Sequence, residues 1–403
     1  MKQLSLLTPK HTLDELYPPG SVYAPRGDFG KIGWVHKDRF RLDSATAYSL
    51  SIMGDMPVIC HRDGVIPEFL AWLHQAGVHV TKRYAPYEGE AEYIDVACSY
   101  VAEGGRLVML YPLPDSLNDN PKLLFPYSLY DYLNNKANIP ELVPAHHLPR
   151  HSFFTLGELE LTVNFMPESE VYLKACVDGA SGSGTGVWFC PDKDARMAAL
   201  AQMVDGAGLM GVRVEEALDI DVCWCVNISV LDTSVYYVGA AMQLFDAPAR
   251  QTGNRIDPDC MPSNDVINLA LAIGERAREK GFLGVAGLDI GVDQQGRVYA
   301  FDLNFRLVAC TPQILFHEAA CERADTRLSQ SWSVLVDAPL MAAAERLEPL
   351  VESRRLIPLR GFAGNALSQG VSVLSGILLA DDTEGLAQMT GKLEHALSDI
   401  LVK

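Results

Sequence analysis

The sequence predicts a multidomain α/β and α+β protein that begins with a unit built on a parallel sheet. Its 403 residues are more than one hydrophobic core usually serves and are typical of two or three domains. Hydrophobic residues make up 48% of the chain and charged residues 21%, a balance typical of globular proteins. Before Phe125, short apolar runs alternate with helical patterns, and this alternation favours a parallel sheet.

The first unit is expected to contain three strands and two helices, recognised by short apolar runs and by amphipathic spacing. They are a strand at 56–60, a helix at 67–76, a strand at 78–80, a helix at 93–103 and a strand at 106–111. Gly77 follows the first helix as a C-terminal stop residue would. Residues 115–126 are rich in proline, aspartate and asparagine, which predicts a linker to the next domain.

Beyond the linker, three further helices are predicted from their apolar spacing. They lie at 128–136, 266–280 and 317–325, and the segment 309–313 before the last of them is expected to be a loop. His317 and Glu318 on that last helix are either acid–base residues or, more simply, a surface pair.

A lysine on an apolar strand, residues 171–177, stands just before a glycine-dense loop, residues 178–186. Lys174 offers a cation and the loop offers backbone N–H groups, a combination that suits phosphate. A Walker A loop is excluded, because the Gly-Lys-Ser/Thr ending that opens a helix is absent. Protein kinases share the strand–loop–strand form, but their lysine follows the glycine loop. The alternative is a flexible hairpin tip beside a surface lysine.

A downstream hairpin carries acids and an amide on one face. Its strands are expected at 285–292 and 297–307, joined by a turn at 293–296. In the second strand, apolar side chains such as Phe301 alternate with polar ones, so Asp302, Asn304 and Arg306 should share a face.

The register of this hairpin decides which acids meet. An even-numbered turn pairs Val292 with Arg297, which places Asp289 opposite Ala300 and one diagonal step from Asp302. Carboxylate and amide oxygens are the ligands that Mg²⁺ prefers. The alternative is an amphipathic strand that shows its polar face to water.

The order of lysine strand, glycine loop, acidic linker and Asp…Asp-x-Asn-x-Arg hairpin resembles the ATP-grasp superfamily of carboxylate–amine ligases, in particular peptide ligases of natural-product pathways. The motifs lie between 125 and 306. The resemblance implies an N-terminal Rossmann-like parallel sheet, residues 1–122, followed by the two α+β subdomains of an ATP-grasp fold, residues 123–210 and 211–403.

The resemblance also implies the site residues. The nucleotide would be bound by Lys136, Lys174, Gly182, Ser183, Gly184, Thr185, Glu215, Glu216, Ala217, Asp219 and Asp221. Of these, Lys136 could instead be a solvated helix end. The strand at 212–218 would be the hinge that reads adenine, with only one of Glu215 and Glu216 facing the nucleotide, and either Asp219 or Asp221 would hold the ribose.

Asp289, Asp302 and Asn304 would hold two Mg²⁺ ions, for which Mn²⁺ could substitute, while Lys174 and Arg306 would be catalytic and stabilise the phosphoryl oxygens. Position 302 is commonly glutamate in the superfamily, so the aspartate here departs from the usual pattern.

The activity implied is ligation: a carboxylate attacks ATP to give an acyl phosphate and ADP, and an amine then displaces phosphate to form an amide. The expected partners are small-molecule carboxylates and amines, such as amino acids or peptides, and a second copy of the chain in a homodimer. The alternatives are a phosphotransferase of the same fold and a non-catalytic ATP-binding regulatory protein.

Composition narrows the remaining classes of partner. A net charge of −18 disfavours nucleic acids and anionic membranes, which attract basic surfaces. Nine scattered cysteines without a CxxC motif, and the lack of an apolar signal-peptide segment at the start, lead us to expect a cytoplasmic protein with reduced thiols. Arg354, Arg355 and Arg360 form a basic run that either receives a substrate carboxylate or covers the rim of the site.

Overall fold

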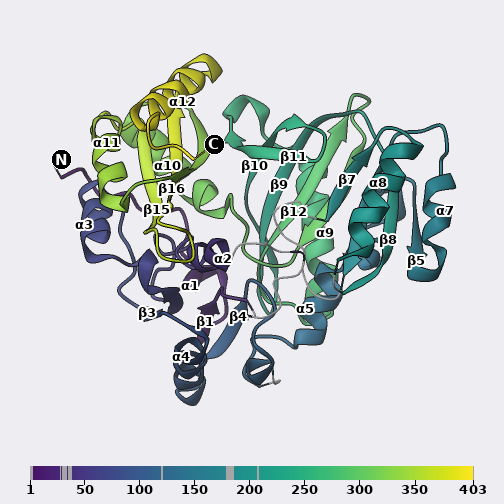
Figure 1. The fold of residues 1–403 in the computed structure, drawn as a ribbon, viewed down its shortest axis with the longest axis horizontal. Helices are drawn as coiled ribbons and strands as arrows, with labels where there is room; N and C mark the ends of the chain where they lie inside the picture. The colour runs from purple at the N-terminus through teal and green to yellow at the C-terminus, as the bar shows by residue number, and fades with distance from the viewer. Residues whose placement is uncertain are drawn as a thin grey trace.

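The computed structural model describes residues 3–27, 29, 34, 39–118, 121–177, 186–206 and 208–402. Three sheets organise these residues: a parallel sheet near the N-terminus, a small antiparallel sheet and a large antiparallel sheet. The small sheet lies on one side of the molecule and the N-terminal unit lies on the other, beside the last strands and helices of the chain (Figure 1).

The N-terminal sheet has the order β3-β2-β1-β4, and all its pairings are parallel. Its strands are β1 (Ser21–Ala24), β2 (Val58–His61), β3 (Tyr84–Tyr87) and β4 (Arg106–Met109), and its helices are α1 (Leu13–Leu16), α2 (Arg39–Ala45), α3 (Pro67–Gln75) and α4 (Glu90–Ala102). The parallel sheet expected from alternating strands and helices is therefore confirmed.

One strand of this unit was misplaced by the sequence prediction. Val78 forms only an isolated bridge with Leu7, and residues 78–80 are not a strand. The reason is local, because the Val78 N–H still closes the preceding helix by donating to the Leu73 carbonyl at 2.9 Å. The strand at the edge of the sheet is β3, which tolerates Pro86 because an edge strand needs fewer ladder hydrogen bonds.

The small sheet has the order β5-β8-β6-β7 and a core of its own. It contains β5 (His151–Thr155), β6 (Val171–Val177), β7 (Val187–Cys190) and β8 (Leu209–Glu216), with α7 (Leu159–Asn164) and α8 (Lys193–Val204) packed on it. Leu173 on β6, Met203 on α8 and Val214 on β8 are fully buried members of that core. The expected boundaries at 122/123 and 210/211 stay predictions, and the second falls inside β8.

The large sheet has eight strands in the order β13-β12-β9-β10-β11-β14-β16-β15. They are β9 (Ile220–Val230), β10 (Val235–Ala247), β11 (Arg250–Ile256), β12 (Gly284–Asp293), β13 (Val298–Asn304), β14 (Leu328–Val336), β15 (Leu356–Phe362) and β16 (Ser372–Ala380). The helices of this part are α5 (Tyr127–Asn134), α6 (Ile139–Leu142), α9 (Asn264–Glu279), α10 (Thr311–Ala324), α11 (Leu340–Glu352) and α12 (Thr383–Leu397). In the described part of the chain, no helix combines the length and the apolar character needed to cross a membrane.

The predicted helix at 266–280 corresponds to α9 within two residues. The predicted loop at 309–313 was partly wrong, since Thr311 to Gln313 already form the first turn of α10 with Pro312 near its start. Proline is favoured there because the first turn has no use for its missing N–H.

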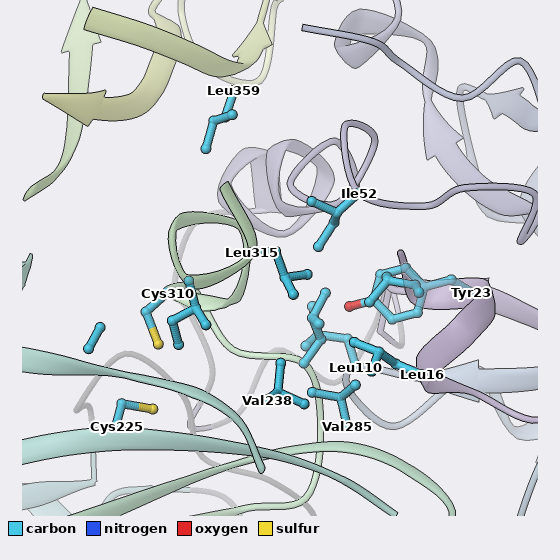
Figure 2. Close-up of a cluster of buried hydrophobic side chains, with 14 of the residues drawn as sticks. Leu16, Tyr23, Ile52, Leu110, Cys225, Val238, Val285, Cys310, Leu315 and Leu359 are labelled. Atoms are coloured by element: carbon cyan, nitrogen blue, oxygen red, sulfur yellow. The ribbon is translucent and has the colours of Figure 1, made fainter. Parts of the chain in front are cut away.

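One apolar core joins the N-terminal unit to the large sheet. Figure 2 shows Tyr23 and Leu110 from the N-terminal unit pointing toward Leu315 on α10 and toward Val238 and Val285 on the large sheet. The small sheet is absent from this cluster and is the part of the fold that depends least on it.

Candidate active site

The β12–β13 hairpin brings two carboxylates face to face. Asp289 is the direct register partner of Asp302, not its diagonal neighbour, so the expected pairing of Val292 with Arg297 was wrong. Val292 pairs with Val298, and a register shift after Asp289 adds Phe301 as an extra residue on β13. The bulge also leaves Phe301 half-buried at a cavity, where strict alternation had placed it in the core.

The turn between the two strands explains why Val292 pairs with Val298 and not with Arg297. The Asp293 side chain accepts hydrogen bonds from the backbone N–H groups of Gln295 and Arg297, each at 2.9 Å. The turn is therefore one residue longer than the predicted Asp-Gln-Gln-Gly turn, and the ladder begins at Val298.

The two facing carboxylates have opposite electrostatic surroundings. Burial, together with the charge of Asp302, raises the pKa of the Asp289 carboxyl to about 7. Burial alone would also raise the pKa of Asp302, but the cationic side chains of Lys136 and Lys174 hold it below its ordinary value. The pair thus concentrates negative charge at Asp302 and would accommodate added positive charge at Asp289.

The donor set of this hairpin fits a hard divalent cation. Asp289, Asp302 and Asn304 all line the same cavity and supply carboxylate and amide oxygens. Within the described ranges, no cluster of three or more His, Cys, Asp and Glu side chains is close enough to form a metal site. A cation here would therefore depend partly on oxygen atoms from a ligand or from water, as Mg²⁺ bound with nucleotide phosphates does.

Lys136 reaches the same carboxylates from the segment after α5. The predicted helix at 128–136 ends at Asn134, and Lys136 begins a 3₁₀ turn, Lys136–Asn138. Its side chain is 6% exposed, and its Nζ lies 2.5 Å from the Asp302 Oδ1. The alternative of a solvated helix end was therefore wrong for Lys136.

Lys174 connects the small sheet to the β12–β13 hairpin. Its Nζ donates to the Phe301 carbonyl at 2.7 Å and lies 2.5 Å from the Glu215 Oε2. Its side chain is 6% exposed, so it is not the snorkelling surface lysine of the alternative interpretation. A buried lysine in this position lies between the two sheets that border the cavity.

Glu215 and Glu216 occupy different environments at the end of β8. Glu215 is 1% exposed and pairs with both Lys174 and Arg213, whereas the Glu216 Oε1 accepts the Arg150 backbone N–H at 2.7 Å. Burial alone would raise the pKa of the Glu215 carboxyl, but the two cations hold it below its ordinary value.

Of the remaining predicted nucleotide residues, Asp219 and Asp221 line the cavity and Ala217 does not. The predicted strand at 212–218 ends at Glu216, and the Ala217 N–H donates to the Glu170 carbonyl at 3.1 Å. Asp219 and Asp221 are exposed residues of the cavity lining, and the Asp219 Oδ2 accepts from Gln294 at 2.9 Å.

Part of the glycine loop lies outside the described residues, namely the predicted positions Gly182, Ser183, Gly184 and Thr185. The strands on either side of it are described. Lys174 is the register partner of Val187, and the Ala175 N–H donates to the Gly186 carbonyl at 2.8 Å. Both Lys174 and Gly186 line the cavity.

A cavity of about 1440 Å³ contains these groups. The predicted residues on its lining are Lys136, Lys174, Glu215, Glu216, Asp219, Asp221, Asp289, Asp302, Asn304 and Arg306. Arg306 is 9% exposed, and one of its terminal nitrogens donates to the Asn304 Oδ1 at 2.7 Å. His317 and Glu318 are not on this lining. The His317 ring forms a hydrogen bond with Ser329, and Glu318 pairs with Lys10.

Two functional neighbours were missed from the sequence. Arg213 stands two residues before Glu215, and this period-two spacing could have identified it as a same-face partner. Gln243 hydrogen-bonds the Asp289 carboxyl and lowers its pKa, opposing the effect of burial. Gln243 is on β10 and is far from Asp289 in sequence, so no local pattern points to it.

Comparison with known families identifies two matching family models. A family model described as the L-aspartate–L-methionine ligase N-terminal domain matches residues 12–131. A second, described as the ATP-grasp domain of L-aspartate–L-methionine ligase, matches residues 149–304. Together the two models cover more than half of the chain.

Solved structures with this fold have low sequence identity to the chain. N5-carboxyaminoimidazole synthase from Aspergillus clavatus, in complex with ADP and 5-aminoimidazole ribonucleotide, is 11% identical, with a TM-score of 0.56 over 93% of this chain and 98% of that one. An L-amino acid ligase from Bacillus licheniformis is 12% identical, with a TM-score of 0.51 over 85% and 97%.

A third structure carries a metal nucleotide. The biotin carboxylase domain dimer of 2-oxoglutarate carboxylase from Hydrogenobacter thermophilus, in complex with MgADP, ADP and bicarbonate, is 13% identical, with a TM-score of 0.53 over 95% and 90%. At these identities the likeness shows the shared fold.

Proposed function

The chain belongs to the ATP-grasp superfamily of carboxylate–amine ligases, and we propose that it joins two amino acids in an ATP-dependent reaction. The observation that carries this proposal is the convergence of Asp289, Asp302, Lys136 and Lys174 on one cavity. Facing carboxylates bordered by buried lysines suit a metal-bound triphosphate better than they suit a solvated surface.

The residues divide into a part for phosphate and a part for metal. We assign Lys136, Lys174 and Arg306 to phosphoryl oxygens, because each is a buried cation on the cavity lining. We assign Asp289, Asp302 and Asn304 to two Mg²⁺ ions, with Mn²⁺ as a substitute. When bound, the metal would neutralise charge on the β- and γ-phosphate oxygens.

The nucleoside would lie toward the end of β8. We assign adenine to the segment from Glu215 to Ala217 and the ribose to Asp219 or Asp221, which lie in the outer lining of the cavity. Gly182, Ser183, Gly184 and Thr185 would supply backbone N–H groups to the phosphates. In support, Lys174 lies on β6, the strand before this segment, and pairs with Val187 on β7, the strand after it.

The reaction proceeds in two balanced steps. A carboxylate oxygen of the donor amino acid attacks the γ-phosphorus of ATP, the bond to the β–γ bridging oxygen breaks, and ADP leaves. The amino nitrogen of the acceptor then attacks the carbonyl carbon of the acyl phosphate, phosphate departs with the C–O bonding electrons, and the nitrogen loses a proton. Lys174 and Arg306 hold the phosphoryl oxygens through both steps, and exclusion of water protects the acyl phosphate from hydrolysis.

The substrates we propose are L-aspartate and L-methionine, on the strength of the two matching family models. We also propose a homodimer, the state named for the Hydrogenobacter biotin carboxylase domain that shares the fold. Sedimentation at several protein concentrations would test the oligomeric state separately from the chemistry.

The function is tested by incubating the protein with ATP, MgCl₂, L-aspartate and L-methionine and analysing the products by mass spectrometry. A ligase gives a dipeptide together with equal amounts of ADP and phosphate, and much less ADP when either amino acid is omitted. A stable phosphorylated amino acid without amide would indicate a phosphotransferase. ATP binding without ADP release, across a panel of amino-acid pairs, would indicate a regulatory protein.

A further inference from the structure

Arg360 is a buried arginine that pairs with no acidic side chain in the part of the chain that the structure describes. It lies on β15, is 8% exposed and forms part of the cavity lining. Its Nε is buried without a hydrogen-bond partner, and it makes no ion pair with any residue of the described ranges. Its guanidinium makes a cation–π contact with the ring of Tyr48, whose centroid lies 4.5 Å from the guanidinium carbon.

Each of the other buried arginines in the described part of the chain forms an ion pair or a hydrogen bond. Arg26 lies 2.6 Å from Asp43, Arg213 lies 2.5 Å from Glu215, and Arg306 donates to Asn304. Arg196 donates to several backbone carbonyls, among them that of Phe165. A chain with a net charge of −18 has no shortage of acids. Arg360 therefore stands apart from the rule that buried charges are paired.

Burial affects the ionisation of this group. Desolvation lowers the pKa of Arg360, Tyr48 opposes that effect, and the nearby charge of Arg41 adds to it. A guanidinium held in this way is costly to the empty protein and is satisfied when an anion enters the cavity. A planar carboxylate matches its paired N–H donors.

The position of Arg360 separates it from the phosphate-binding cations. β13, which carries Asp302 and leads to Arg306, forms one edge of the large sheet, and β15 forms the opposite edge. Arg360 thus enters the cavity from the other end of the sheet, where Leu335 and Val373 also line it. Phe362, two residues along β15, packs with these two apolar side chains. Arg360 therefore lies beside apolar side chains, with a second cation, Arg41, also on the cavity lining.

We propose that Arg360, supported by the ring of Tyr48, binds the carboxylate of an amino-acid substrate that does not react with ATP. This inference rests on the proposed ligase function. Two such carboxylates exist in an aspartate–methionine ligation, the second carboxylate of the donor and the α-carboxylate of the acceptor. Both present the same chemistry to the guanidinium, so the experiment distinguishes them.

The kinetic test uses Arg360→Met, Arg360→Lys and a control, Arg355→Met. Arg355 is a suitable control because its guanidinium pairs with Asp381 on the surface at 3.4 Å. We expect Arg360→Met to raise the KM of one amino acid about 10- to 100-fold, as loss of a charge-assisted hydrogen bond does. The KM of ATP should change less than about threefold, Arg360→Lys should recover part of the loss, and Arg355→Met should resemble the parent.

A stability measurement separates binding from a structural role. Because Arg360 pairs with no acid among the described residues, Arg360→Met should melt at the same temperature as the parent or higher. A structural arginine would instead lower the melting temperature when replaced.

The source of the carboxylate is identified by calorimetric binding in the presence of a non-hydrolysable ATP analogue and MgCl₂. L-methionine is compared with L-methioninamide, and L-aspartate with L-asparagine, in the parent and in Arg360→Met. The parent should bind the acid of one pair more tightly than its amide, and Arg360→Met should bind the two alike. Loss of discrimination in the methionine pair assigns the acceptor carboxylate, and loss in the aspartate pair assigns the donor.

The outcomes distinguish this inference from the function on which it rests. If the parent protein formed no dipeptide, the proposed ligation would be wrong. The binding comparison would still test whether Arg360 recognises a carboxylate. Equal discrimination in the parent and in Arg360→Met, or no binding of either amino acid by the parent, would overturn the role of Arg360.

Discussion

Asp289 and Asp302 are direct partners across the β12–β13 ladder, with Phe301 bulged out of register beside them. The bulge aligns the two carboxylates and leaves the Phe301 carbonyl free of the ladder, where it accepts from the Lys174 Nζ at 2.7 Å. The bulge at Phe301 therefore brings the two aspartates of the large sheet close to Lys174 of the small sheet. Bulges of this kind commonly re-aim side chains next to active sites.

Replacing Asp302 tests the assignment of the facing carboxylates. Asp302→Asn keeps the size of the side chain but removes the charge that would hold a divalent cation and that balances Lys136. We expect ADP release to fall by about 100-fold or more, because electrostatic stabilisation of a transferring phosphoryl group is among the largest catalytic effects. The measurement is the initial rate of ADP formation at saturating MgCl₂.

The control for this variant is Asp232→Asn, an exposed aspartate between β9 and β10. It removes the same charge away from the cavity lining and should leave the rate within about twofold of the parent, as surface substitutions usually do. A rate for Asp302→Asn that matches this control would contradict the metal assignment.

Replacing Lys174 tests its role between the two sheets. Lys174→Met keeps the length of the side chain but removes the bonds to Phe301 and Glu215 and the positive charge at the cavity. We expect the affinity for ATP to fall about 10- to 100-fold, as loss of a charged hydrogen-bond donor does. Equilibrium binding of a fluorescent ATP analogue measures it, with exposed Lys392→Met as the matched control.

The sequence predicted those features of the site that depend on residues close together in the chain. Alternation along β13 was enough to group Asp302 with Asn304, because side chains two residues apart share a face. The assumption of an even-numbered turn gave the wrong partner for Asp289. Neither the Phe301 bulge nor the hydrogen bonds that the Asp293 side chain makes in the turn can be recognised in the hydrophobic pattern.

The basic run near the C-terminus is a second example of what the sequence alone could not distinguish. Arg354, Arg355 and Arg360 are equivalent in sequence, yet Arg355 pairs with Asp381 at the surface while Arg360 is buried at the cavity. The guanidinium of Arg360 lies over the ring of Tyr48, which is more than three hundred positions away and belongs to the N-terminal unit. Contacts of that range are set by tertiary packing, which a single sequence does not display.

Glu215 predicts a specific dependence of stability on pH. Its pKa lies below the ordinary value of 4.5, because Lys174 and Arg213 outweigh the opposing effect of burial. The unfolded chain therefore takes up a proton at higher pH than the folded protein does. The stabilisation by Glu215 is complete above about pH 4.5 and is lost as the pH falls through the lower, folded-state pKa.

Glu215→Gln should remove this contribution. At pH 7 we expect the variant to be destabilised by about 3–5 kcal/mol, because two buried cations lose their carboxylate. The difference from the parent should shrink as the pH is lowered below about 4.5. Urea unfolding at a series of pH values measures both effects. Glu216→Gln, which alters a half-exposed carboxylate, is the control, and a difference that stays constant with pH would contradict the assignment.

The separate cores of the two sheets predict separate opening. Met203 is fully buried in the core of the small sheet, and Leu315 is 1% exposed in the core shared by the large sheet and the N-terminal unit (Figure 2). Replacing either by alanine should cost about 2–5 kcal/mol in the unit that contains it, through lost burial and the cavity left behind. Hydrogen–deuterium exchange resolves where the cost appears.

We expect Met203→Ala to speed amide exchange in β5 to β8 and to leave β9 and β12 unchanged, while Leu315→Ala should do the reverse. Adding ATP with MgCl₂ should then restore protection of the small sheet in Met203→Ala, because Lys174 would be held to the phosphates as well as to Phe301. If both variants loosened all three sheets alike, the protein would open as one unit. In that case the small sheet could not close over a nucleotide independently of the rest of the fold.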